Sequence, residues 1–160
     1  MVCGKDLIRA LKGGVEYWNA LRHQNPDIVM LNGADLENAQ LPCADLHRVF
    51  LMESDLRRAN LSCANLEGAI LRNADLRGSD LRHANIAGAD LCRANLSGAD
   101  LREASLTSTF MKRTDVRGAD LSTALGLTDA QINDAFGDDR TRLPGSLARP
   151  TSWAAQGPWR

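Results

Sequence analysis

Aromatic residues are scarce in this sequence of 160 residues: three Trp, three Phe and one Tyr make up 4% of it. Large aromatic side chains supply much of the buried area in a conventional globular core. Their scarcity therefore favours a core of smaller aliphatic residues, although the hydrophobic content is an ordinary 44%. The length is that of one domain.

Long hydrophobic runs are absent as well. No apolar segment approaches the length needed to span a membrane, and residues 1–5 lead into an amphipathic stretch that does not resemble a signal peptide. Val2 stands where N-myristoylation needs a glycine. We therefore expect a cytoplasmic protein with no membrane partner, whose free thiols are Cys3, Cys43, Cys63 and Cys92.

Residues arranged for catalysis are missing too. The three histidines, His23, His47 and His83, lie in no recognisable nucleophile, phosphate-loop or paired-acid motif. The many aspartates recur at a regular spacing and mark no separate motif. We expect neither enzymatic activity nor a cofactor.

What the sequence does contain is a five-residue repeat, in nineteen consecutive units across residues 29–123. The central position is Leu except at Ile86, Met111 and Val116, and the position two residues earlier is Ala at thirteen sites. The residue directly before the central position is Asp or Asn at thirteen sites. Gly recurs two residues after the central position. Asp and Asn favour turns because their side chains bond to nearby backbone, and Gly eases a tight corner.

A five-residue period fits neither a straight helix nor a straight strand. Five residues of an α-helix rotate a side chain by about 140°, and five residues of a strand send it to the opposite face. The chain must therefore turn once per unit to keep every Leu and Ala in one core. This predicts a solenoid whose units stack on their neighbours.

With Ala-Asp/Asn-Leu-X-X units such as residues 89–93 and 119–123, the sequence resembles the pentapeptide-repeat proteins. The resemblance implies an all-β solenoid, a right-handed quadrilateral β-helix with four units, or twenty residues, per coil. Nineteen units then give about five coils, a rod roughly 23 Å long at the usual strand spacing.

The open ends of a solenoid need covering, and both flanks have helical patterns. Before the repeat, residues 5–12 and 15–23 are separated by two glycines, and Val15, Trp18 and Leu21 share a helical face. We expect this face to sit on the first coil. Residues 1–28 are therefore predicted to form an N-terminal helical cap.

After the β-helix of residues 29–123, Thr128 and Gln131 form a capping box that begins a helix. We expect this helix to end near Gly137, with Ile132 and Phe136 on one face. Residues 124–137 are thus predicted to be a C-terminal capping helix. Residues 138–160 form a proline-containing tail that could pack back on one face of the rod.

At twenty residues per coil, the outward positions directly before the central residue stack into columns. One of these, the apolar column, consists of Met30, Phe50, Ile70, Asp90 and Phe110 and is apolar at four of its five places. An exposed apolar stripe usually marks a contact. Met30, Phe50, Ile70 and Phe110 are therefore the candidate contact face.

Three kinds of cover would fit the apolar column. The tail could fold back and lay Leu147, Trp153 or Trp159 over it. A second subunit could cover it in a homodimer, or a foreign protein could bind there. The sequence leaves these alternatives open, so the protein is expected to be a monomer or a homodimer.

The charges of the repeat bear on a function known in the family. Some pentapeptide-repeat proteins protect DNA gyrase from quinolones, and the resemblance implies that an acidic rod does so by imitating duplex DNA. Residues 29–123 contain thirteen acidic and eleven basic residues. A DNA mimic needs a sustained negative field, so topoisomerase regulation is an alternative that this balance disfavours.

Four cations share the face of the apolar column and are interleaved with acidic residues: Arg72, Arg93, Lys112 and Arg113, with Glu53 and Asp90 among them. Exposed aromatic platforms, on which bases could stack, are absent. We expect no nucleic-acid partner.

A second column, the thiol column, consists of Cys43, Cys63, His83 and Glu103, which are residue types that zinc accepts. Outward residues in a straight ladder do not converge tetrahedrally, so no metal is expected. Cys43 and Cys63 are near enough for a disulfide, although a reducing compartment favours stacked thiols.

These observations predict a non-catalytic interaction scaffold that presents flat β-helix faces to an unidentified protein partner.

Overall fold

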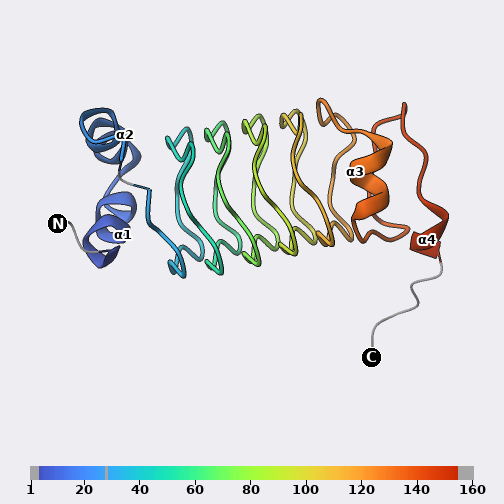
Figure 1. Ribbon diagram of the computed structural model, residues 1–160, viewed down its shortest axis with the longest axis horizontal. Helices are drawn as coiled ribbons and strands as arrows, with labels where there is room; N and C mark the ends of the chain where they lie inside the picture. The colour runs from blue at the N-terminus through green and yellow to red at the C-terminus, as the bar shows by residue number, and fades with distance from the viewer. Residues whose placement is uncertain (1–3, 28, 155–160) are drawn as a thin grey trace.

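The structure is a computed structural model that describes residues 4–27 and 29–154. Stacked turns of chain form a rod, with helices α1 (Gly4–Lys12) and α2 (Val15–Gln24) at one end (Figure 1). Helices α3 (Asp129–Asp134) and α4 (Thr151–Ala154) lie at the other end. None of the helices in these ranges is long and apolar enough to cross a membrane.

Parallel bridges between residues twenty apart set the register of the rod, from Met30 with Phe50 to Ser105 with Leu125. Two kinds of backbone hydrogen bond join the coils. The central residue donates to the next coil and the bridged residue donates to the previous one, as from Ile70 to Val49 at 3.0 Å. The predicted coil of four units is confirmed by this register.

Each unit ends in a tight turn in which the Ala N–H donates to the preceding Leu carbonyl, as from Ala74 to Leu71 at 3.0 Å. The residue before that Ala has a positive φ. Glycine enters this region without strain, yet twelve non-glycine residues hold it too, with φ between 55° and 61°. Most of their backbone N–H groups donate to the next coil, as from Cys43 to Ser62 at 2.8 Å, and these bonds offset the strain.

The interior is filled by the two inward positions, as predicted. Every central residue from Leu31 to Leu121 is at most 2% exposed. Where Ser54 and Ser79 replace Ala, each hydroxyl donates to the carbonyl of the Leu three residues earlier, at 2.7 and 2.8 Å. Buried hydroxyls with a partner avoid most of the cost of desolvation, so the narrow core tolerates them.

Helices α1 and α2 pack against the first coil. Leu7, Leu11 and Trp18 belong to the same core cluster as the repeat leucines. The Trp18 indole N–H also donates to the Asp45 carbonyl at 2.8 Å. Leu21 is partly buried against the same cluster, as predicted for the apolar face of this helix.

The capping box of α3 is confirmed. The Thr128 side chain accepts from the backbone of Gln131, whose own side chain accepts from the backbone of Thr128. The Gln131 amide also donates to the carbonyls of Leu106 and Thr109, at 2.8 and 3.0 Å. Because of these bonds, the start of α3 is tied to the coil beneath it.

The end of α3 differs from the prediction, because the helix stops at Asp134 and not near Gly137. Phe136 leaves the helix since its backbone returns to the β-ladder. Its N–H donates to the Thr114 carbonyl at 2.8 Å and its carbonyl accepts from Val116 at 2.7 Å. The expectation that Ile132 and Phe136 share a helix face is therefore wrong.

The ladder continues beyond the last unit. Phe136 bridges Asp115 and Arg142 bridges Asp120, at separations of 21 and 22 residues in place of twenty. The chain thus inserts α3 and then adds two more rungs to the rod.

Candidate functional site

The structure brings the predicted contact residues into one column. Consecutive bridges join Met30, Phe50, Ile70, Asp90 and Phe110. Met30 is 57% exposed and Phe110 is 61% exposed, whereas Phe50 and Ile70 are half-buried. The apolar column therefore presents most of its exposed surface at its two ends.

Asp90 interrupts the apolar column without exposing its charge. The residue is 7% exposed, and its carboxylate accepts from Arg72 Nε and from the Cys92 backbone N–H at 3.0 Å. Burial alone would raise the pKa of Asp90, but hydrogen bonds from Cys92 and the Arg72 ion pair outweigh it and lower this pKa. Asp90 thus holds Arg72 in place across the coil.

Two of the tail residues predicted to cover the apolar column pack elsewhere: Leu147 lies against the core cluster, and Trp153 lies at the end of the rod. Trp153 is 3% exposed, and its indole N–H donates to the Ala135 carbonyl at 3.0 Å. Its ring fills the space beside Gly137, at the end of the rod where α4 lies (Figure 1). Trp159, the other aromatic proposed as a cover, lies outside the described residues.

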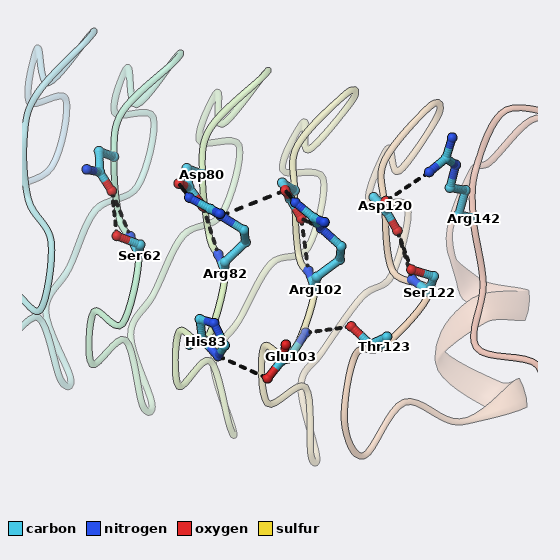
Figure 2. Close-up of polar contacts among 12 residues, drawn as sticks. Ser62, Asp80, Arg82, His83, Arg102, Glu103, Asp120, Ser122, Thr123 and Arg142 are labelled. Carbon is cyan, nitrogen blue, oxygen red and sulfur yellow. Dashed lines mark hydrogen bonds and ion pairs between the residues drawn. The ribbon is translucent and has the colours of Figure 1, made fainter.

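Most surface aspartates of two faces are paired within their own unit, in an Asp-X-Arg arrangement. Asp80 is typical: its carboxylate accepts from the Arg82 backbone at 3.1 Å and from Arg82 Nε and Nη2 at 2.9 and 2.7 Å. Figure 2 shows Arg82 beside Asp80. Arg82 also reaches the next coil, where an Asp100 carboxylate oxygen lies 3.9 Å from its Nε. The same local pairing occurs at Asp55, Asp75, Asp100 and Asp115.

These pairs shift the aspartate pKa values downward. The side-chain hydrogen bond from the neighbouring arginine is the main cause at Asp55, Asp75, Asp80 and Asp100. Asp138 goes furthest, with a pKa of about 2. There, burial would raise the pKa, but bonds from the Gly118 backbone, Arg140 and Thr141 more than offset it.

Stability is expected to fall in acid because of these carboxylates. A carboxyl whose pKa is lower in the folded state contributes stability above its unfolded pKa, and that contribution is lost as the pH falls through the folded pKa. For Asp138 the window runs from 3.8 down to about 2. The melting temperature should therefore drop between pH 4 and pH 2.

An Asp138→Asn variant isolates one part of this effect. It should lose about 1–2 kcal/mol of stability at pH 7, after allowance for solvent screening, and should lose less than wild type on acidification. Melting curves followed by circular dichroism from pH 7 to pH 2 measure both quantities. Parallel pH profiles for the two proteins would contradict the assignment.

In the thiol column, the histidine pairs with the glutamate, and the two cysteines form no disulfide. His83 Nδ1 lies 3.2 Å from Glu103 Oε2 (Figure 2), while Cys43 and Cys63 are free thiols. The pKa of the Cys63 thiol is raised, mainly by burial and to a smaller extent by the neighbouring Cys43. In the described ranges, no group of three His, Cys, Asp or Glu side chains is placed to hold a metal ion.

A pocket on the face of the apolar column was not recognised from the sequence. It has a volume of about 370 Å³ and is lined by Arg72, Asn73, Cys92, Arg93, Lys112 and Arg113; we call it the cationic groove. Along the sequence, these cations are interleaved with acidic residues. Placing them in columns of twenty would have separated the Arg93 and Arg113 pair from the aspartates.

Comparison with known sequences identifies the repeat. The signature described as pentapeptide repeats matches residues 29–58, 59–98 and 84–122, in eight copies. Together these matches span more than half of the chain. A search of curated proteins finds no match.

Solved structures of other repeat proteins are similar to this chain. A pentapeptide repeat protein from the thylakoid lumen of Arabidopsis thaliana is 27% identical, with 68% of this chain and 74% of the other covered and a TM-score of 0.53. Rfr23 from the cyanobacterium Cyanothece 51142 is 25% identical, with 78% and 97% covered and a TM-score of 0.42. QnrB1, a plasmid-mediated fluoroquinolone resistance protein, is 19% identical, with 73% and 78% covered and a TM-score of 0.39. Only the first of these three has a TM-score above 0.5.

Proposed function

Because the chain belongs to the pentapeptide-repeat family and has its right-handed quadrilateral β-helix, we propose that it is a non-catalytic scaffold that binds a protein partner. The β-helix suits this role, since its backbone ladders hold outward side chains at fixed spacings. A preorganised surface loses little conformational entropy on binding.

The scaffold that we propose has about five coils and is closed at both ends. Helices α1 and α2 cap the first coil, where Trp18 is fully buried. Helix α3 and the tail cap the last, where Ile132 and Trp153 are buried. These caps prevent end-to-end stacking of exposed coil edges, and so they leave the side faces as the surfaces for binding.

The exposure of the apolar column is the observation that carries the proposal. Met30 and Phe110, at its two ends, are the most exposed large apolar side chains of the described β-helix apart from Leu125. Apolar side chains aligned on one face of a soluble protein commonly mark a contact. We therefore assign the partner-binding surface to this column.

A double substitution tests the assignment. Met30→Asp with Phe110→Asp places charges at both exposed ends of the apolar column, and we expect a specific protein captured by wild type to be lost. Tyr17→Asp is the matched control, because Tyr17 is 62% exposed and belongs to α2 and not to the apolar column. Affinity capture from native extract, followed by mass spectrometry, makes the comparison.

Two outcomes would contradict the proposal. The first is the same set of captured proteins for wild type, control and double variant. The second is a wild-type dimer that becomes a monomer in the double variant, measured by sedimentation velocity. That result would make the apolar column a surface for self-association.

Topoisomerase regulation by DNA mimicry remains the less favoured alternative. It requires a sustained negative field, whereas the paired Asp-X-Arg units neutralise Asp55, Asp75, Asp80, Asp100 and Asp115 locally. The cationic groove would moreover repel the basic surface that a DNA mimic must bind.

A further inference from the structure

The cationic groove is lined by four positively charged side chains. Arg93 and Arg113 occupy the same position in successive coils, and the bond from the Arg93 backbone N–H to the Lys112 carbonyl, 3.0 Å, fixes the coils side by side. Adjacent rungs are about 4.8 Å apart. Like charges placed directly opposite one another in a ladder are destabilising.

Other stacked arginines of the described β-helix have carboxylates to separate them. Arg82 and Arg102, for example, alternate with Asp80 and Asp100. In the groove, the one nearby carboxylate that forms an ion pair is Asp90, and it is bonded to Arg72. Among the residues that the structure describes, none supplies a carboxylate within 4.0 Å of Arg93, Lys112 or Arg113.

The groove is also partly ordered in advance. The Arg113 guanidinium lies 5.9 Å from the centroid of the Phe136 ring, close enough for a cation–π contact. Asp90 holds Arg72, another of the lining residues. Cys92 also lines the groove and adds no negative charge, because burial and the neighbouring Asp90 raise the pKa of its thiol.

We infer that the cationic groove binds a compact oligophosphate group, held by Arg93, Lys112 and Arg113. Guanidinium groups donate two parallel hydrogen bonds to phosphate. One phosphate carries about −1.5 to −2 charge at pH 7, so two linked phosphates match the three cations that have no carboxylate partner. A volume of about 370 Å³ lies within the size range of small-ligand sites. The groove lies on the same face as the apolar column, but the inference does not depend on the protein-binding role proposed for that column.

Titration calorimetry with pyrophosphate at low ionic strength tests the inference. Wild type should bind pyrophosphate with saturation at one site, and Arg93→Gln or Arg113→Gln should weaken binding by about tenfold each, as expected for loss of a charged hydrogen bond. Arg58→Gln is the matched control. Arg58 is exposed, has the same turn position with φ of 55° and forms no ion pair with any residue that the structure describes, but it lies on another face.

Further probes identify the source and class of the ligand. ADP and phosphatidylcholine vesicles with 5% phosphatidylinositol bisphosphate distinguish a soluble nucleotide from a lipid headgroup, and Arg93-dependent binding of either supports the inference. Citrate that binds as tightly as pyrophosphate would overturn the phosphate assignment. A single-stranded oligonucleotide that binds more tightly than pyrophosphate would overturn it in favour of nucleic acid. Equal pyrophosphate affinity in wild type and Arg93→Gln, or none in wild type, would remove the site.

Discussion

Leu76→Ala should lower the free energy of unfolding by about 2–5 kcal/mol, toward the upper end of that range. Leu76 is fully buried in a middle coil. Its N–H donates to the Asn95 carbonyl at 2.7 Å, so the distance to the next coil is set by the backbone ladder. The coils cannot close on the cavity, and most of the lost packing is therefore not recovered.

Chemical denaturation followed by circular dichroism measures this loss, and the melting temperature should fall by about 4–20 °C. Leu125→Ala is the matched control, because Leu125 is the same residue type in the same rod but is 58% exposed. It should change stability by less than about 0.5 kcal/mol. Similar losses in both variants would mean that the buried leucine column does not hold the coils together.

The fold could be predicted from the sequence because the same pattern of residues recurs in nineteen consecutive five-residue units. A five-residue period with Leu and Ala at fixed places excludes helix and strand alike, and the structure buries both positions. The columns of twenty followed from the resemblance, and the bridges from Met30 to Phe110 confirm them. The local preference of each unit agrees with the overall fold, and such agreement makes the fold easy to predict from the sequence.

The features that could not be predicted from the sequence depend on contacts between residues that are far apart along the chain. Helix α3 ends early because the Phe136 backbone pairs with the backbone of Thr114 and Val116. No pattern in the sequence around Phe136 predicts that the chain returns to the β-ladder there. The sequence places Asp90 on the same face as Arg72, but it does not show that Asp90 is buried and bonded to this arginine. The columns of twenty place Arg93 and Arg113 one above the other, but the pocket that they line with Lys112 is visible only in the structure.

The N-terminal cap leads to the second large effect, that of Trp18→Ala. Trp18 is fully buried between α2 and the first coil, and its indole N–H satisfies the Asp45 carbonyl. Removal of a buried Trp costs about 3–5 kcal/mol, and the carbonyl loses its partner as well. In a stack where each coil contacts only its neighbours, the loss should act first on the end coil.

Hydrogen exchange measured by mass spectrometry resolves this local effect. In Trp18→Ala, amides of α1, α2 and the first coil should exchange faster, while those around Leu76 and Leu96 keep more of their protection. Tyr17→Ala is the control, because Tyr17 is the neighbouring aromatic on α2 and is 62% exposed. An uncapped rod should also self-associate more readily, since its first coil offers unpaired backbone groups to another chain. A Trp18→Ala protein with native protection in the first coil and no added association would show that α2 is attached to the rod without capping it.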